Sequence, residues 1–106
     1  LHYQEKEFAQ EKLFTLIKGE VKFYCLNIDD YDVYYSFNLQ VNDKLTLYVP
    51  KGWATGFHTL GEENIVYFCS NQKYSPNSEI SINFSIIPEL KNMNFIISDK
   101  DNFIKD

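Results

Sequence analysis

The chain has no arginine: all ten of its basic residues are lysines, against fifteen acidic residues and a formal net charge of -5. Phosphate backbones are bound by clusters of Lys and Arg, and base edges are read most often by Arg. An acidic chain without Arg is therefore a poor candidate for binding nucleic acid, and we expect no such partner.

The 106 residues also lack a long hydrophobic run, a signal-peptide pattern and an initiating Met. No apolar stretch approaches the roughly 18 residues that cross a bilayer, so we expect no membrane partner. The absent Met predicts that a segment upstream of Leu1 was removed or not included. Because no secretion signal is visible, we expect a cytoplasmic location.

Cysteine and histidine are both scarce, with two residues of each. Cys25 and Cys69 are too few for a disulfide scaffold and lie inside strand-like runs, which predicts two buried free thiols. His2 and His58 are far apart in the sequence, and no spaced Cys cluster accompanies them. We therefore expect neither a bound metal nor another cofactor.

Aromatic residues, in contrast, make up 17% of the chain and fall mostly in short alternating runs, which is typical of β-structure. Alternation and turn residues predict strands at 13–17, 21–28, 33–39, 45–49, 54–60, 65–70 and 79–87, and one more apolar run at 95–97. Strands spaced by about ten residues indicate an all-β sandwich or barrel, taken as a single domain over 1–106. Ser98 and Asp99 offer an N-cap for a short C-terminal helix through Ile104.

Several segments, in a fixed order, match the pattern of one enzyme family. The clearest are the Leu-His-Tyr-Gln opening followed by Lys12, and the Pro-x-Gly-aromatic-Ala-x-Gly-Phe turn at 50–57. Further matching pieces are 12–13, 19–21, 47–49, 74–79 and 97–101. Together they cover most of the chain and resemble the dTDP-4-dehydrorhamnose 3,5-epimerase family. The resemblance implies a cupin fold, which is a jelly-roll barrel, with the family's N-terminal strands absent here, and a homodimer.

The resemblance also implies a substrate and a mechanism. The family acts on a nucleotide-diphosphate-linked 4-keto-6-deoxy sugar, in deoxysugar and surface-polysaccharide biosynthesis. The keto group acidifies the C3 and C5 hydrogens, so a base removes a proton, an enolate forms, and an acid returns a proton to the opposite face. By resemblance, His2 is the base, Asp101 is its carboxylate partner and Lys12 stabilises the enolate. The implied substrate-binding residues are Tyr3, Gln4, Trp53, Thr55, Phe68 and Tyr74.

The chain departs from the family pattern at Asn27, where the family commonly has Asp, over the segment 83–88, and at two positions of the implied site. Phe68 stands where the family has its acid, a Tyr, and a Phe side chain has no proton to give. The adjacent Tyr67 should face the other way because side chains alternate along a strand, unless a one-residue bulge exchanges the two. Thr55 stands where the family has a His.

These departures leave three functions open. The first is an epimerase acting at C3, C5 or both, with Tyr74, Tyr67 or water in the role of the missing acid. The second is a catalytically inactive cupin that binds a nucleotide sugar or a partner enzyme. The third is a sugar 3,4-ketoisomerase, which the absence of a Gly-x-His-x-His pattern disfavours. If Tyr67 points into the barrel opposite His2, the epimerase is favoured.

Overall fold

Short strands dominate residues 1–91, the part of the chain that the structure, a computed structural model, describes. The strands are β1 (His2–Gln4), β2 (Lys12–Lys18), β3 (Glu20–Asn27), β4 (Tyr34–Gln40), β5 (Thr46–Val49), β6 (Trp53–Thr59), β7 (Ile65–Ser70) and β8 (Glu79–Ser81). Four 3-10 turns accompany them: η1 (Lys6–Phe8), η2 (Val41–Asp43), η3 (Phe84–Ile86) and η4 (Pro88–Leu90). The run expected at 95–97, the helix expected at 98–104 and Asp101 lie outside the described residues.

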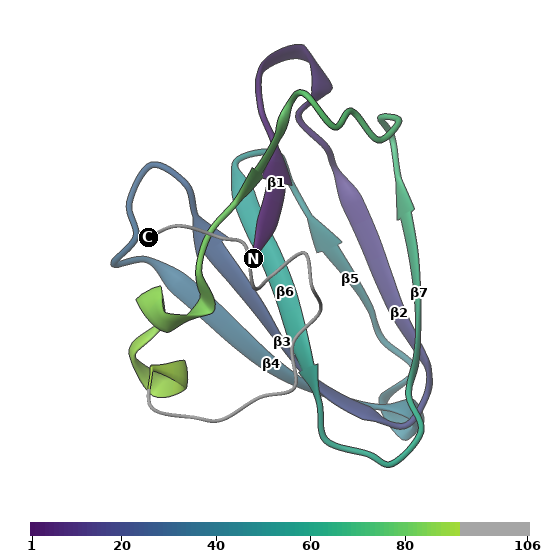
Figure 1. The fold of residues 1–106 in the computed structure, drawn as a ribbon. Helices are drawn as coiled ribbons and strands as arrows, with labels where there is room; N and C mark the ends of the chain where they lie inside the picture. Colours follow the sequence, from purple (N-terminus) through teal and green to yellow (C-terminus); the bar gives the residue numbers. More distant parts are fainter. Residues whose placement is uncertain (92–106) are drawn as a thin grey trace.

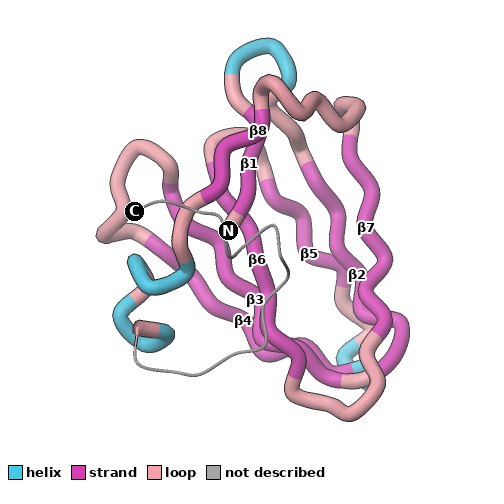
Figure 2. Tube along the Cα trace, in the orientation of Figure 1, coloured by secondary structure: helices cyan, strands magenta, loops and turns pink. Residues whose placement is uncertain are grey.

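The strands form two antiparallel sheets, which lie on either side of a shared interior (Figures 1 and 2). One sheet has the order β4-β3-β6-β1-β8, and the other has the order β5-β2-β7. The chain crosses from β2 to β3 at Gly19, whose φ of +89° lies in the left-handed region that favours glycine. The all-β architecture predicted from the alternation is thereby confirmed.

Strand β3 is buried on both faces. Its successive side chains point to opposite sides of the sheet, and a hydrophobic core covers each side. On one face, Val21, Phe23 and Cys25 join a core between the two sheets. The other members of this inner core are Phe14, Leu16, Leu39 and Val49. On the opposite face, Tyr24 and Leu26 join an outer core. This double burial fixes the five-stranded sheet as the centre of the molecule.

The outer core shows where the strand predicted over 79–87 was wrong. Only Glu79–Ser81 is strand; after it, the Asn83 side chain accepts a hydrogen bond from the Ser85 backbone N–H at 2.9 Å and starts η3. Pro88, which has no N–H for a sheet ladder, then starts η4. The apolar residues of this segment pack on the outer face of the large sheet instead, with Ile82, Ile87 and Leu90 all buried.

Two other details differ from the sequence-based expectation. Residues 2–4 form strand β1, which three residues are too few to reveal by alternation. Cys69 is exposed rather than buried, because it lies on the outward face of β7 opposite Leu13. Cys25 is buried as expected, and burial raises the pKa of its thiol to about 11. The Cys25 thiol is therefore a protonated core group.

We predict that Leu26→Ala lowers the free energy of unfolding by about 3 kcal/mol. The Leu26 side chain is fully buried in the outer core, so its removal leaves a cavity that the packed sheet cannot fill. Leu60→Ala, at a side chain that is 48% exposed, is the matched control and should cost much less. Urea denaturation measures both values, and equal losses would contradict this account of the core.

Candidate active site

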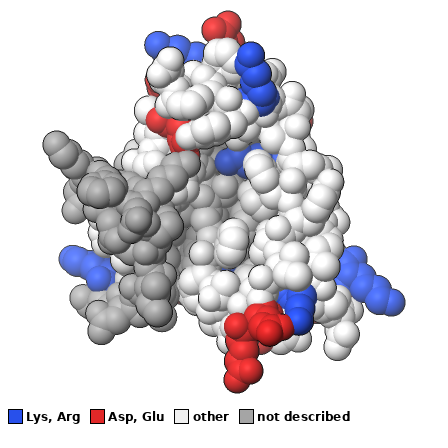
Figure 3. Space-filling view, turned by 45° about the vertical axis from the view of Figure 1, so that its right-hand side comes forward, with Lys and Arg blue, Asp and Glu red and all other residues white. Residues whose placement is uncertain are grey.

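A cavity of about 360 Å³ opens between the two sheets, at the end of the barrel where β1 ends and β2 begins. It is lined by His2, Tyr3, Gln4 and Glu79 from the large sheet, by Lys12, Phe68 and Ser70 from the small sheet, and by Gln10, Gln72 and Tyr74 from loops. Six of the predicted site residues, His2, Tyr3, Gln4, Lys12, Phe68 and Tyr74, are among these lining residues. On the face of the molecule drawn in Figure 3, charged side chains gather mainly near the upper and lower ends.

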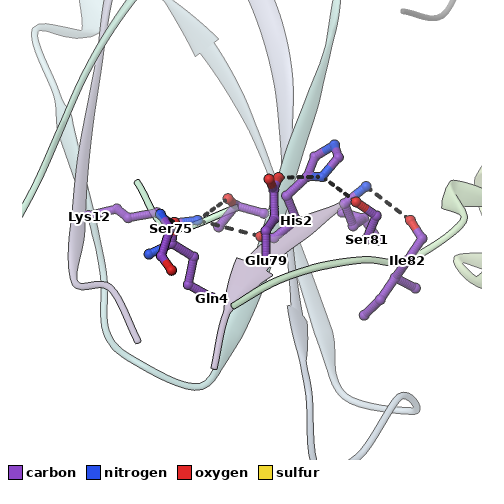
Figure 4. A network of polar contacts seen from close by, with 9 residues as sticks. His2, Gln4, Lys12, Ser75, Glu79, Ser81 and Ile82 are labelled. Carbon is purple, nitrogen blue, oxygen red and sulfur yellow. Dashed lines mark hydrogen bonds and ion pairs between the residues drawn. The ribbon is translucent and has the colours of Figure 1, made fainter. Parts of the chain in front are cut away.

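His2 is held by the strand beside it. In the large sheet, β1 lies between β6 and β8, which brings Ser81 and Glu79 alongside His2 (Figure 4). The His2 Nδ1 atom lies 2.8 Å from Ser81 Oγ and 3.2 Å from Glu79 Oε1. An ionised Glu79 can only accept, so a hydrogen on Nδ1 would be donated to it, and the lone pair of the neutral ring would then be on Nε2. A general base needs that tautomer.

Lys12 extends from the small sheet across the cavity to the large one. Its ammonium donates to Thr55 Oγ1 at 3.2 Å and to the His2 carbonyl at 3.4 Å, and only 6% of the residue is exposed. Within residues 1–91 it forms no ion pair, although the more distant Glu79 charge partly favours the ammonium. Burial lowers the pKa of Lys12 below its ordinary value of 10.5. A buried cation with only neutral acceptors is well suited to stabilise a negative charge that forms beside it.

We predict that Lys12→Met raises the free energy of unfolding at pH 7 by about 1–3 kcal/mol, because it removes this buried charge. The gain should shrink as the pH rises toward 10.5. The pKa of Lys12 is lower in the folded state than in the unfolded state, so the folded protein loses this proton at a lower pH. The wild-type protein therefore gains stability as the pH rises from the folded-state pKa toward 10.5. Lys51→Met, at an exposed turn, is the control. Denaturant melts at pH 7 to 10 measure the difference, and a gain that does not change with pH would contradict the assignment.

Phe68 points into the cavity and Tyr67 points away from it. Phe68 pairs with Phe14, and the two rings stack with centroids 5.1 Å apart, on the interior side of the small sheet. Tyr67 pairs with Thr15 on the outward side and is 60% exposed. The one register shift between β2 and β7 falls at Leu16–Lys18, on the side away from the cavity, so no bulge exchanges the two residues. The sequence-based prediction for the two orientations is confirmed.

Other predicted residues take different positions. Thr55 is buried, accepts the hydrogen bond from Lys12 and is not among the residues that line this cavity. Trp53 packs against the inner core and the Tyr35 ring, with centroids 5.6 Å apart, and is not among the residues that line this cavity. Tyr3 and Tyr74 both line it, and burial raises the pKa of Tyr3.

Sequence reasoning missed two groups in the described part of the chain that contact the imidazole of His2. Glu79 lay within the segment 74–79 that carries the resemblance, but it was given no role there. Ser81 belonged to a predicted strand whose partner was unknown. The antiparallel register, His2 opposite Ser81 and Gln4 opposite Glu79, brings both residues to the site. Only the pairing of β8 with β1 could have revealed them.

Residues 1–91 contain neither a metal-binding cluster nor a membrane-spanning helix. No group of three His, Cys, Asp or Glu side chains among them is arranged to hold a metal ion. None of the helices in this part of the chain is both long enough and apolar enough to cross a membrane.

The chain is similar to a set of named proteins. A family model described as dTDP-4-dehydrorhamnose 3,5-epimerase matches residues 1–106. A relative of that name from Shigella flexneri is 33% identical over 108 residues, which cover 95% of this chain and 60% of the relative. Another, from Salmonella typhimurium, is 36% identical over 86 residues, 77% of this chain and 47% of the relative. The chain thus spans 60% or less of the length of these two relatives.

Solved structures of proteins named as 3,5-epimerases of dTDP sugars have the same fold. The dTDP-4-dehydrorhamnose 3,5-epimerase of Bacillus anthracis, with TDP and PPi bound, gives a TM-score of 0.87 at 26% identity, covering 99% of this chain and 64% of that one. The dTDP-6-deoxy-D-glucose-3,5-epimerase of Legionella pneumophila, in complex with dTDP-4-keto-L-rhamnose, gives 0.82 at 28% identity, covering 96% and 58%. These likenesses confirm the expected cupin fold. The chain belongs to the dTDP-4-dehydrorhamnose 3,5-epimerase family.

Proposed function

We propose that this chain carries the base and the enolate-stabilising cation of an epimerase acting on a dTDP-linked 4-keto-6-deoxy sugar. The observation that carries the proposal is the pair formed by His2 and Lys12. An imidazole held through Nδ1 and a buried ammonium with no carboxylate in contact, among the described residues, line one cavity. That combination suits proton abstraction next to a carbonyl group better than it suits binding alone.

In the proposed reaction, His2 removes the proton from C3 or C5 of the sugar. The electron pair of that C–H bond forms the enolate double bond, and negative charge moves to the 4-oxygen, where Lys12 stabilises it. Glu79 stabilises the imidazolium that forms, together with Asp101 as the resemblance implies. Return of a proton to the same carbon restores the ketone, and the face on which it arrives decides the product.

Phe68 determines what happens on the opposite face. Its ring occupies the interior side of β7, where the resemblance places the acid, and it has no proton to donate. Tyr67 lies outside the barrel, so we assign the return of the proton to water or to Tyr74. We therefore propose slow inversion, restricted to the carbon that such a donor reaches.

The substrate-binding surface that we propose is largely aromatic. Tyr3, Phe68 and Tyr74 line the cavity and offer ring faces to the sugar and the thymine base. Trp53 and Thr55 remain part of the proposal as residues that shape the wall around Lys12. The second proposed partner is another copy of the chain, because Leu13, Ile17 and Tyr48 are exposed together on the outer face of the small sheet.

A catalytically inactive cupin is the second candidate, and the orientation of Phe68 is the observation that favours it. Such a protein would bind the nucleotide sugar in the same cavity without exchanging a proton. Incubation with dTDP-4-keto-6-deoxyglucose in deuterated water separates the two candidates. The epimerase incorporates deuterium at C3 or C5, which mass spectrometry detects. Binding of the sugar with no incorporation would overturn the epimerase and leave the inactive cupin.

A further inference from the structure

Both polar atoms of the Gln4 side chain form hydrogen bonds within the protein. Gln4 ends β1, and only 5% of the residue is exposed. Its Nε2 donates to the Phe8 carbonyl at 2.9 Å and to the Lys73 carbonyl at 3.1 Å, while its Oε1 accepts from the Ser75 backbone N–H at 2.8 Å. Both amide hydrogens are therefore donated, and a substrate could gain one only by displacing a backbone carbonyl.

These three hydrogen bonds join two loops that lie side by side at one end of the barrel (Figure 1). The first loop, residues 5–11, contains η1, and the second, residues 71–78, connects β7 to β8. Backbone bonds join the same loops at both ends, from Glu5 N to Ser78 O and from Asn71 N to Glu11 O. Side chains of the loops themselves add to these bonds, from Gln10 Nε2 to Gln72 O and between Asn71 and Glu11, and Gln4 bonds to both loops from its buried position on β1.

The position of Tyr74 follows from this arrangement. Gln4 bonds to the backbone of Lys73 and of Ser75, the residues on either side of Tyr74. Tyr74 lines the cavity, and the position of its backbone sets the point from which its side chain extends. Gln4 and His2 are two residues apart on β1 and share one side of that strand. The same short strand thus fixes His2 and, through Gln4, Tyr74.

We propose that Gln4 is a positioning residue, which holds Tyr74 at the rim of the cavity at a set distance from His2 and takes no part in binding the sugar. The inference rests on the proposed function in one respect, because it assumes that Tyr74 contacts the ligand. Its structural half, the tie between the two loops, stands without any ligand.

Hydrogen exchange tests the structural half. Gln4→Glu keeps the acceptor for Ser75 but turns the two donations into repulsion between a carboxylate and two carbonyl oxygens. The amides of residues 71–78 should exchange at least tenfold faster in this variant, while those of β3 stay unchanged. Asn77→Asp makes the same amide-to-carboxylate change at an exposed position of the same loop, and it should have no such effect. If Gln4→Glu does not fold, Gln4→Met replaces it. Unchanged exchange in a folded variant would overturn the proposal.

A double-mutant cycle with dTDP as the ligand tests the functional half. Loss of an aromatic ring that stacks on a base should weaken binding about tenfold, so Tyr74→Ala is expected to do so in the wild-type background. In the Gln4→Met background the same change should cost less than threefold, because the ring is no longer positioned. Equal losses in both backgrounds would overturn the positioning role.

The two readouts distinguish failure of this inference from failure of the proposed function. If the wild-type protein exchanges no deuterium into the sugar but the cycle shows coupling, the epimerase fails and Gln4 keeps its role. If dTDP does not bind at all, the ligand half is overturned, and the exchange of residues 71–78 still decides whether Gln4 ties the loops.

Discussion

His2→Asn is expected to reduce the rate of deuterium incorporation into dTDP-4-keto-6-deoxyglucose by about 10³-fold. The Asn side chain keeps a polar group beside Glu79 and Ser81 but has no basic nitrogen, so it cannot accept the proton from carbon. Lys12 remains in place, so the cavity keeps its charge. Mass spectrometry of the recovered sugar measures the rate for both proteins under identical conditions.

His58→Asn is the matched control for this prediction. His58 lies on β6 beside Tyr24, with His58 Nδ1 3.4 Å from the Tyr24 hydroxyl, and it does not line the cavity. We expect His58→Asn to leave the exchange rate within about twofold of the wild type, because His58 lies away from the cavity and contacts none of the proposed reacting groups in the described part of the chain. A loss caused by His58→Asn, or none caused by His2→Asn, would remove His2 from the role of base.

Phe68→Tyr is expected to increase the rate of inversion by about 10²-fold while changing the rate of exchange little. The added hydroxyl extends from a ring that is 48% exposed and already stands on the interior side of β7, stacked on Phe14. It therefore reaches the cavity without being buried in the core, and the free energy of unfolding should stay within about 0.5 kcal/mol. Proton NMR of the sugar products measures inversion and exchange in the same sample.

Tyr67→Phe is the control, because it removes a hydroxyl from the adjacent position on the outward face of β7. It should change neither rate. If Tyr67→Phe abolished inversion in the wild-type background, Tyr67 would be the acid and the assignment of the two faces of β7 would be wrong. If Phe68→Tyr gave no more inversion than the wild type, the proton would come from elsewhere in the site.

Much of the fold could be predicted from alternation, because most strands here are long enough to show it. Val21, Phe23 and Cys25 mark one face of β3, and the structure places all three in the inner core. Alternation failed where burial did not come from sheet pairing. The apolar residues of 82–90 are buried by packing on the outer face of the large sheet, which looks in the sequence like a continuing strand.

The sequence predicted only those site residues that lie in the segments matching the family pattern. His2, Lys12 and Phe68 were identified from the order of the matching segments, and the structure brings them to one cavity. The roles of Glu79 and Gln4 depend on contacts between segments about 70 residues apart in the chain, which no local pattern encodes. Asp101 lies beyond the described residues, and its partnership with His2 stays a prediction.

The most direct test follows exchange and inversion together by proton NMR, with the wild-type protein and dTDP-4-keto-6-deoxyglucose in deuterated water. Because the site offers a base on one face of the sugar and a phenyl ring on the other, the H3 or H5 signal should disappear faster than the epimeric product appears. An inversion for every exchange would contradict the role given to Phe68. Persistence of both signals, at a protein concentration that binds the sugar, would contradict the central claim that His2 abstracts a proton from it.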